Sequence, residues 1–158
     1  MRWQRVIFFI IIKLLIFISN AYAQIPYKSY CNARFDFCVD HPVAFGIGPA
    51  PTNNDGREFS DRDGFFMIAS GMHNALENSL IDEMKSQEED FDKITYRVKK
   101  KNWFVLSGYK DDNILYLKTY IGKEYIYHLY IRYPAKLKTK YNTLVSTISH
   151  SFKPGPLQ

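Results

Sequence analysis

The side chains best suited to acid–base or metal chemistry are four histidines, and their spacing predicts no shared site. They are His41, His73, His128 and His150. None of them shows the H-x-H or H-x-x-x-H spacing that places two imidazoles beside one metal ion. No serine lies in a G-x-S-x-G turn, and the adjacent Ser149 and His150 would point in different directions on a helix. We therefore expect no catalytic residue, no cofactor-binding residue and no metal ligand.

Two acidic segments share part of the calcium-loop pattern but lack an essential ligand. Residues 61–64 (DRDG) and 53–56 (NNDG) each end in a glycine, as the first half of such a loop does. With that glycine at loop position six, position twelve would be Ser70 in one case and Arg62 in the other, and neither supplies the required carboxylate. We interpret both segments as ordinary turns.

The elements that position these residues begin with strands, because the apolar pattern has a period of two over most of the chain. A half-buried strand region covers 27–40, a loop rich in Gly, Pro and Asn covers 43–55, and residues 56–60 and 65–70 form a hairpin. Four further strands, joined by short polar connections, predict an antiparallel meander. They cover residues 93–100, 103–109, 114–120 and 125–133.

Two amphipathic helices complete the pattern. The first begins at either Asn74 or Ser79, because both have a capping-box spacing, and ends near Glu89. Its apolar stripe is Leu76, Leu80 and Met84. The second follows Pro134, and its apolar face should lie on the sheet. That face consists of Tyr141, Leu144, Val145, Ile148 and Phe152. The expected fold class is α+β, an antiparallel sheet with an N-terminal hairpin region and two main helices packed on it.

The first 23 residues are typical of a secretory signal peptide. Arg2 and Arg5 precede an apolar stretch at 6–18, and an A-x-A site ends at Ala23. The alternative is a membrane anchor, but thirteen residues span only about 20 Å of a hydrocarbon core about 30 Å thick. We expect cleavage after Ala23, a periplasmic or secreted location, and a single globular domain at residues 24–158.

The two cysteines are expected to form a disulfide, because export exposes them to an oxidising compartment. Cys31 and Cys38 flank a short segment that a hairpin turn would fold back, bringing the two sulfurs together. Closing so small a loop contributes about 2–3 kcal/mol on the chain-entropy model. Two free thiols remain the alternative, since an imperfect cross-strand register would hold the sulfurs too far apart.

Charge is divided unevenly along the chain. Residues 24–92 carry 5 basic and 13 acidic side chains, whereas residues 93–158 carry 13 basic and 3 acidic ones. One interpretation is that the two halves face each other within a single domain, and the other is a binding surface of one sign. The acidic group at residues 88–92 has the same two interpretations, a solvated helix end or a binding surface.

A basic run with nearby aromatic residues is the candidate partner-binding site. The run consists of Arg97, Lys99, Lys100 and Lys101, and Trp103 follows it. Basic and aromatic side chains together suit nucleic acid, but export argues against that ligand. Lysines at a strand end also discourage edge-to-edge pairing. The functional alternatives are an acidic protein or an anionic membrane surface.

Four blocks of sequence resemble a family of exported bacterial domains. Residues 30–42 (YCNARFDFCVDHP) are similar to its opening Y-x-N-x-R-F-G-F-S-V-x-Y-P. Further similarity lies at 55–64, at 102–108, and at 133–134 together with 148–152. This resemblance implies the PsbP/DcrB-like fold, an α/β/α sandwich shared with the Mog proteins, and it implies binding rather than catalysis. Asp36 stands where that family has Gly, His41 where it has Tyr, and both cysteines where it has small residues. The resemblance therefore leaves the geometry of the N-terminal hairpin in question.

The function expected from these observations is that of an exported, non-enzymatic binding module without cofactors, whose partner is a protein of the cell envelope. One alternative is a periplasmic immunity protein that neutralises a secreted toxin, as in type VI secretion. The other is a small hydrolase whose site is assembled only by folding. A hydrolase would show a deep pocket in which histidine and carboxylate groups converge.

The A-x-A site generates the first testable prediction. Mature protein isolated from a periplasmic fraction should begin at Gln24, because signal peptidase cleaves after the second small residue of the site. N-terminal sequencing measures this directly. Protein that retains Met1 would instead indicate an anchored form.

Overall fold

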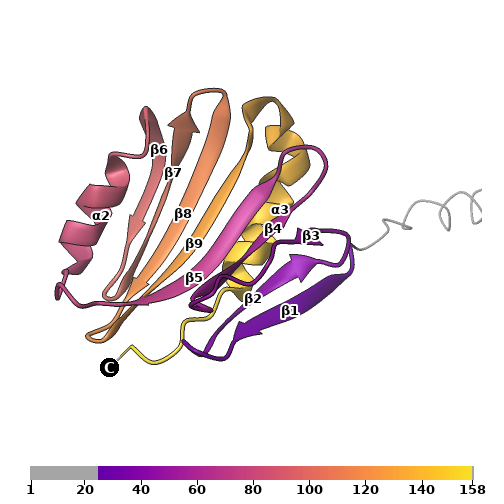
Figure 1. Ribbon diagram of the computed structural model, residues 1–158. Coiled ribbons are helices and arrows are strands. Elements are labelled where there is room, and N and C mark those ends of the chain that lie inside the picture. The colour runs from indigo at the N-terminus through magenta and orange to yellow at the C-terminus, as the bar shows by residue number, and fades with distance from the viewer. Residues whose placement is uncertain (1–24, 158) are drawn as a thin grey trace, which may run out of the picture.

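The computed structural model describes residues 25–157, so the expected signal peptide lies outside the described residues. The chain folds into a two-stranded hairpin, a seven-stranded antiparallel sheet and two main helices (Figure 1). The strands are β1 (Tyr27–Asn32), β2 (Phe37–Pro42), β3 (Gly46–Ile47), β4 (Gly56–Ser60), β5 (Phe66–His73), β6 (Lys93–Lys99), β7 (Trp103–Lys110), β8 (Asn113–Ile121) and β9 (Tyr125–Pro134). The helices are α2 (Leu80–Glu88), the 3-10 turn η1 (Ala135–Leu137) and α3 (Lys138–Ser151). The predicted α+β class is confirmed.

The large sheet has the order β3-β4-β5-β9-β8-β7-β6, so the predicted meander forms one side of it and β5 joins the meander at β9. The bounds of β6 to β9 differ from the prediction by at most one residue at either end. One strand was not predicted: Gly46–Ile47, inside the expected loop, pairs with the end of β4. Two residues are too few to show an alternating pattern, which is why the sequence did not reveal β3.

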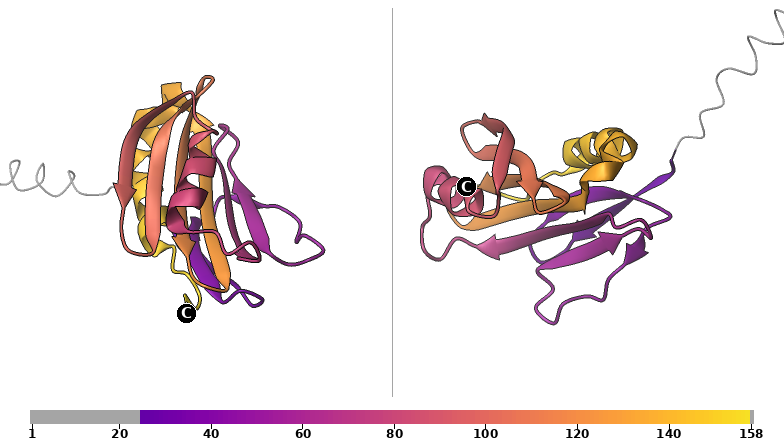
Figure 2. Two further views of the ribbon diagram at one scale, coloured as in Figure 1. Left: turned by 90° about the vertical axis from the view of Figure 1, so that its left-hand side faces the viewer. Right: turned by 90° about the horizontal axis from the view of Figure 1, so that it is seen from above.

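One main helix packs on each face of the sheet, as in an α/β/α sandwich. In Figure 2, α2 and α3 lie on opposite sides of the sheet. Side chains of β9 alternate between them: Tyr127 and Leu129 belong to the large core under α3, whereas Tyr130 packs with the small cluster under α2. The β1–β2 hairpin lies on the α3 side, where Phe37 contacts both Tyr127 and Phe152.

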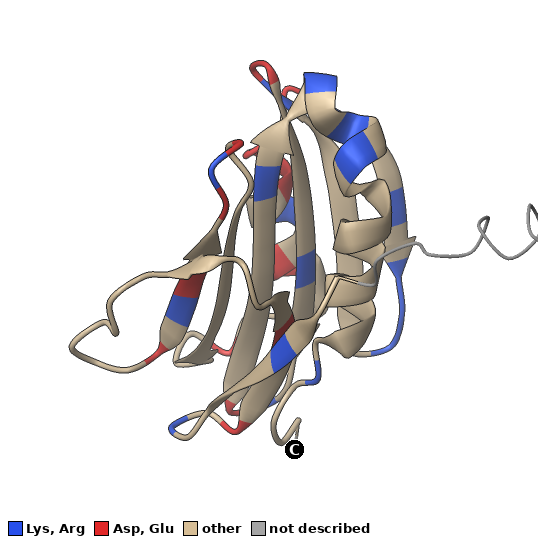
Figure 3. Cartoon of the chain, turned by 90° about the vertical axis from the view of Figure 1, so that its right-hand side faces the viewer, with Lys and Arg blue, Asp and Glu red and all other residues tan. Residues whose placement is uncertain are grey.

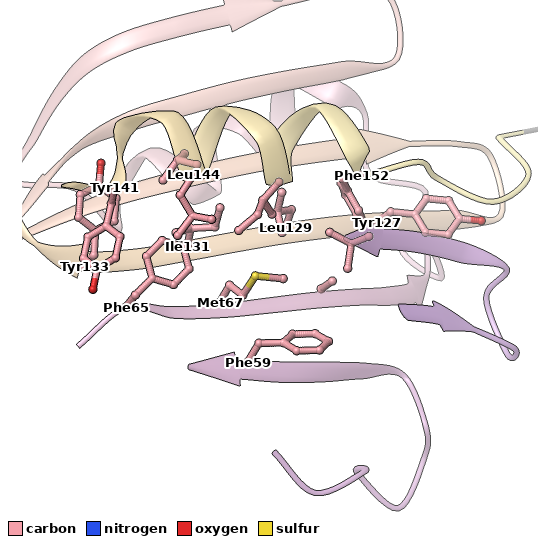
Figure 4. Close-up of a cluster of buried hydrophobic side chains, with 14 of the residues drawn as sticks. Phe59, Phe65, Met67, Tyr127, Leu129, Ile131, Tyr133, Tyr141, Leu144 and Phe152 are labelled. Carbon is pink, nitrogen blue, oxygen red and sulfur yellow. The ribbon is translucent and has the colours of Figure 1, made fainter. Parts of the chain in front are cut away.

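The large core confirms the predicted apolar face of α3. Every member of that face is buried, and together with the strands it forms the cluster in Figure 4. Tyr141 packs against both Phe65 and Tyr133 at one end, and Phe152 against Phe37 at the other. The large rings buried between α3 and the sheet hold the helix firmly in position.

Ser79 caps helix α2, which decides between the two predicted starts. It also removes Leu76 from the predicted apolar stripe. Ser79 accepts from the Asp82 backbone amide and Asp82 accepts in return, which completes the capping box. The other predicted start is wrong, because the backbone of Glu77 turns into the left-handed region (φ 53°). Leu76 therefore precedes the helix and is 84% exposed, so it does not share the stripe of Leu80 and Met84.

The ion pairs join the acidic half of the sequence to the basic half. Among residues 25–157, each such pair links one residue before position 93 to one after it. Glu88 at the end of α2 pairs with Arg97 at 2.7 Å, and Asp92 pairs with Lys110 at 3.1 Å. The acidic end of α2 is thus partly neutralised by β6 and β7. This supports the interpretation that the two halves face each other.

The N-terminal hairpin accommodates the residues that depart from the resembled family. Asp36 adopts the left-handed conformation (φ 57°), which short polar side chains tolerate. His41 is buried, and its ring stacks on Phe59 with centroids 4.4 Å apart, so it fills an aromatic position. Cys31 and Cys38 are directly opposite in the ladder, with Cα atoms 4.1 Å apart and sulfurs at 2.06 Å. The register therefore brings the two sulfurs together, as the disulfide requires.

Removing this disulfide should lower stability without unfolding the core. Replacing Cys31 and Cys38 together by Ser should reduce the free energy of unfolding by about 2–3 kcal/mol, the entropy of closing so short a loop. Denaturant unfolding of both proteins measures the difference, and intact mass after alkylation without reductant tests the bond itself. Complete alkylation of the unreduced protein would show that the bond does not form.

Candidate functional site

A groove of about 720 Å³ lies between α3 and the β6–β7 end of the sheet, on the face opposite α2. Its volume lies in the range of ligand sites, about 300–1,000 Å³. Trp103, Tyr109 and Tyr116 contribute aromatic rings from the sheet. The exposed residues Asn142 and Ser146 line the opposite wall on α3.

The groove exists because α3 covers only part of its face of the sheet. The helix packs on β2, β8 and β9, and the strand pair β6–β7 extends beyond it. In the right-hand view of Figure 2, α3 and the β6–β7 hairpin stand beside each other. Alternation directs Trp103 and Val105 toward α3, whereas Phe104 and Leu106 pack under α2. One face of β7 thus supports the core and the other forms a wall of the groove.

Lys118 provides a buried positive charge in this groove. It lies on β8, is only 8% exposed, and its Nζ donates to the backbone carbonyl of Ser149 at 2.7 Å. The ammonium also lies 5.6 Å from the Trp103 ring centre and 5.2 Å from that of Tyr120. Burial lowers the pKa of Lys118, because removing a cation from water disfavours its charged form. Among the described residues no carboxylate forms an ion pair with it.

The hydroxyl groups beside Lys118 do not form a hydrolytic arrangement. Tyr116 and Ser149 share a hydrogen bond of 2.6 Å between their hydroxyl oxygens. Burial raises the pKa of Tyr116, and the bond to Ser149 offsets part of that rise. Lys118 contacts the carbonyl of Ser149 rather than its Oγ. The residues that line the groove in the structure include His150 but no Asp or Glu, so histidine and carboxylate groups do not converge here.

The predicted partner-binding residues divide between two surfaces. Arg97 is on the α2 face, where it is engaged by Glu88. Lys99, Lys100 and Lys101 are exposed at the end of β6 and in the turn to β7. The Lys100 amide donates to the Trp103 carbonyl at 2.8 Å, so this basic turn adjoins the aromatic end of the groove.

Lys118 was not predicted as a site residue, although the sequence carries a signal for it. Residues 116, 118 and 120 of a strand share one face, and the outer two are tyrosines. A lysine between two aromatic residues on one strand face is therefore placed among apolar side chains. What the sequence did not show is that α3 would lie beside this face.

The segments considered as calcium loops are turns in the structure. Asp61 Oδ1 accepts from the backbone amides of Asp63 and Phe65, both at 2.9 Å. Its other oxygen accepts from the Tyr141 hydroxyl, and Lys140 pairs with Asp63. These carboxylates thus fasten the β4–β5 turn to the start of α3. Across residues 25–157, no three His, Cys, Asp or Glu side chains gather as metal ligands.

A smaller hollow of about 270 Å³ on the α2 face contains His128. Gln87 donates through Nε2 to His128 Nδ1 at 3.1 Å, and its Oε1 accepts from Thr119 at 2.9 Å. The second ring nitrogen lies 3.8 Å from the Glu83 carboxylate. Burial lowers the pKa of His128, and the charge of Glu83 opposes that shift. This polar cluster fastens α2 to β8 and β9.

Comparison with known proteins identifies the fold. No family model matches the sequence, and no curated protein matches it. The architecture is a PsbP-like fold. The chain is similar to the solution structure of CyanoP, the cyanobacterial PsbP of Synechocystis sp. PCC 6803, with a TM-score of 0.59 and 10% identity over 85% of this chain and 96% of that chain. At this identity the similarity shows the fold alone, so the expected PsbP-like fold is confirmed.

Among the residues that the structure describes, no helix is long and apolar enough to cross a membrane.

The partly buried His128 should make stability depend on pH. Its folded-state pKa lies below the unfolded value of about 6.5, so the unfolded chain binds the proton more readily. The stabilisation is fully present above pH 6.5 and is lost as pH falls through the folded-state pKa. Thermal unfolding at pH 7.5 and 5.5 should show a smaller drop for His128→Gln than for wild type. An equal drop in the two proteins would place the pH dependence elsewhere, and His150→Gln, an exposed histidine, is the matched control.

Proposed function

We propose that this protein is an exported, non-enzymatic binding module of the cell envelope that recognises an acidic protein partner. The recognition surface comprises the groove between α3 and β6–β7 and the adjoining basic turn of Lys99, Lys100 and Lys101. The observation that carries the proposal is the composition of the groove, in which aromatic rings and cations are present and carboxylates are absent from the described lining.

The electrostatics of this surface favour a negatively charged partner. Lys138 and His150 line the groove together with Lys118. Figure 3 shows basic residues gathered around the start of α3. In the sequence, Lys136 lies in η1 and Lys138 is the first residue of α3. Complementary potentials steer encounter and suppress wrong partners, and aromatic side chains contribute contact area at the centre of interfaces.

Binding rather than catalysis is favoured by the engagement of the polar groups. Tyr116 is hydrogen-bonded to Ser149, and both ring nitrogens of His128 face partners within the fold. A general base or nucleophile needs a reactive atom directed at a substrate.

Charge reversal at the basic turn tests this function. Replacing Lys99, Lys100 and Lys101 together by Glu should leave the fold intact, because exposed lysines without ion pairs contribute little to stability. Affinity capture from envelope extract should recover less of the partner, since like charges would then repel. Circular dichroism verifies folding, and mass spectrometry of the captured proteins also shows whether the partner is a toxin.

The matched control reverses three lysines that lie away from the groove. Lys28, Lys85 and Lys153 are exposed, lie on other elements and take part in no ion pair among residues 25–157. Their triple Glu variant carries the same net charge and should capture the partner as wild type does. The same proteins recovered with both variants, in the same amounts, would contradict the proposed surface.

A further inference from the structure

Lys118 is a buried cation that the fold does not neutralise. Its ammonium has three N–H donors, and the described residues provide one acceptor, the Ser149 carbonyl. A carbonyl dipole near the end of α3 stabilises a cation there but supplies no opposite charge. Isolated buried charges are costly, so proteins pair them or use them. The position of Lys118 in the groove wall points to a counter-ion supplied from outside.

The surroundings of Lys118 define which counter-ion fits. The Trp103 ring lies against the ammonium, and hydroxyl or amide groups of Ser146 and Asn142 line the same groove. Rings and hydrogen-bonding groups of this kind suit a carboxylate borne by an apolar or aromatic chain. Lys138 at the other end of α3 and the basic turn beyond Trp103 extend the positive potential along the groove.

The shape favours an extended segment of chain. The groove follows α3, a helix of fourteen residues that is about 21 Å long at 1.5 Å per residue. About six residues of extended peptide, at about 3.3 Å each, cover the same length. We propose that the groove receives an extended acidic segment of the partner protein, and that one of its carboxylates pairs with the Lys118 ammonium. This inference rests on the proposed function, because it assigns the contact made within that surface.

Selection from a random nonapeptide display library tests the site without knowledge of the partner. Peptides retained by the mature domain should be enriched in Asp and Glu with interspersed aromatic residues. A selected peptide, synthesised with a fluorescent label, should lose affinity when each acidic residue is replaced in turn by its amide. One replacement should cost at least tenfold, as expected for a charged hydrogen bond in a partly buried site. Selected peptides without acidic enrichment would overturn the proposal.

Substitution of Lys118 identifies the contact. Lys118→Met keeps the apolar stem and removes the charge, so affinity for the acidic peptide should fall at least tenfold. Affinity for the peptide whose critical acid has been replaced by its amide should change little. This coupling between the two replacements is what a structural role of Lys118 would not produce. If the Lys118 substitution and the peptide replacement each reduce affinity and their effects simply add, Lys118 only supports α3 and does not contact the peptide.

A second pair of variants leaves Lys118 in place. Ser146→Glu puts a negative charge on the exposed wall of the groove, whereas Thr147→Glu puts the same charge one residue further along α3, outside the lining. The first should weaken the acidic peptide severalfold by repulsion, and the second should not. Equal effects of the two variants would show that the peptide binds elsewhere.

These outcomes separate the inference from the function on which it rests. One outcome is that Lys118→Met weakens the binding of acidic peptides while charge reversal at the basic turn leaves capture from envelope extract unchanged. The groove is then a ligand site, but the proposed partner surface is wrong. If capture depends on the basic turn while Lys118→Met binds acidic peptides as wild type does, the function stands and the assigned contact is wrong.

Discussion

Coverage of a wide sheet by narrow helices determines most of this structure. Seven strands spaced about 4.8 Å apart extend about 29 Å across, whereas a helix with its side chains is about 10–12 Å wide. Helix α3 covers the middle of its face, over β8 and β9, and the β1–β2 hairpin covers the part nearer β5. Nothing in residues 25–157 covers the same face of β6 and β7. The groove is the uncovered remainder of this face.

The β1–β2 hairpin and α3 together cover one face of the sheet, so contacts from other segments must hold the hairpin in position. Its turn brings Phe35 directly over Gly71, where a Cβ atom would lie only 2.7 Å from the phenylalanine side chain. The segment after α3 then pairs with β2 through Cys38 and Lys153, which exchange two backbone hydrogen bonds. The disulfide lies at the same position and joins β1 to this pair. Three separate segments are thereby held together at one end of the core.

The sequence predicted the elements well where side chains repeat with a clear period. The meander and the buried face of α3 were predicted because each has several turns or alternations to establish its pattern. The start of α2 remained open, since Asn74 and Ser79 share one capping spacing and only the backbone of Glu77 excludes the earlier start. Lys118 was missed for a different reason. A strand pattern gives the face on which a side chain lies, but the position of α3 beside that face is a tertiary property.

The uneven distribution of charge and the groove have a common origin. Acidic residues of the first half lie next to Arg97, Lys110 and Lys140 and neutralise them, so these cations serve the fold. The second half has more cations than nearby carboxylates, and those left without an ion pair include Lys118 and Lys138, both in the groove. The acidic side chains that form these ion pairs lie at the end of α2, in the segment after it and in the turn beside α3. An excess of positive charge therefore remains on the strip of sheet beside α3 that residues 25–157 leave open. An acidic partner bound there would complete both the layer that contains α3 and the charge balance.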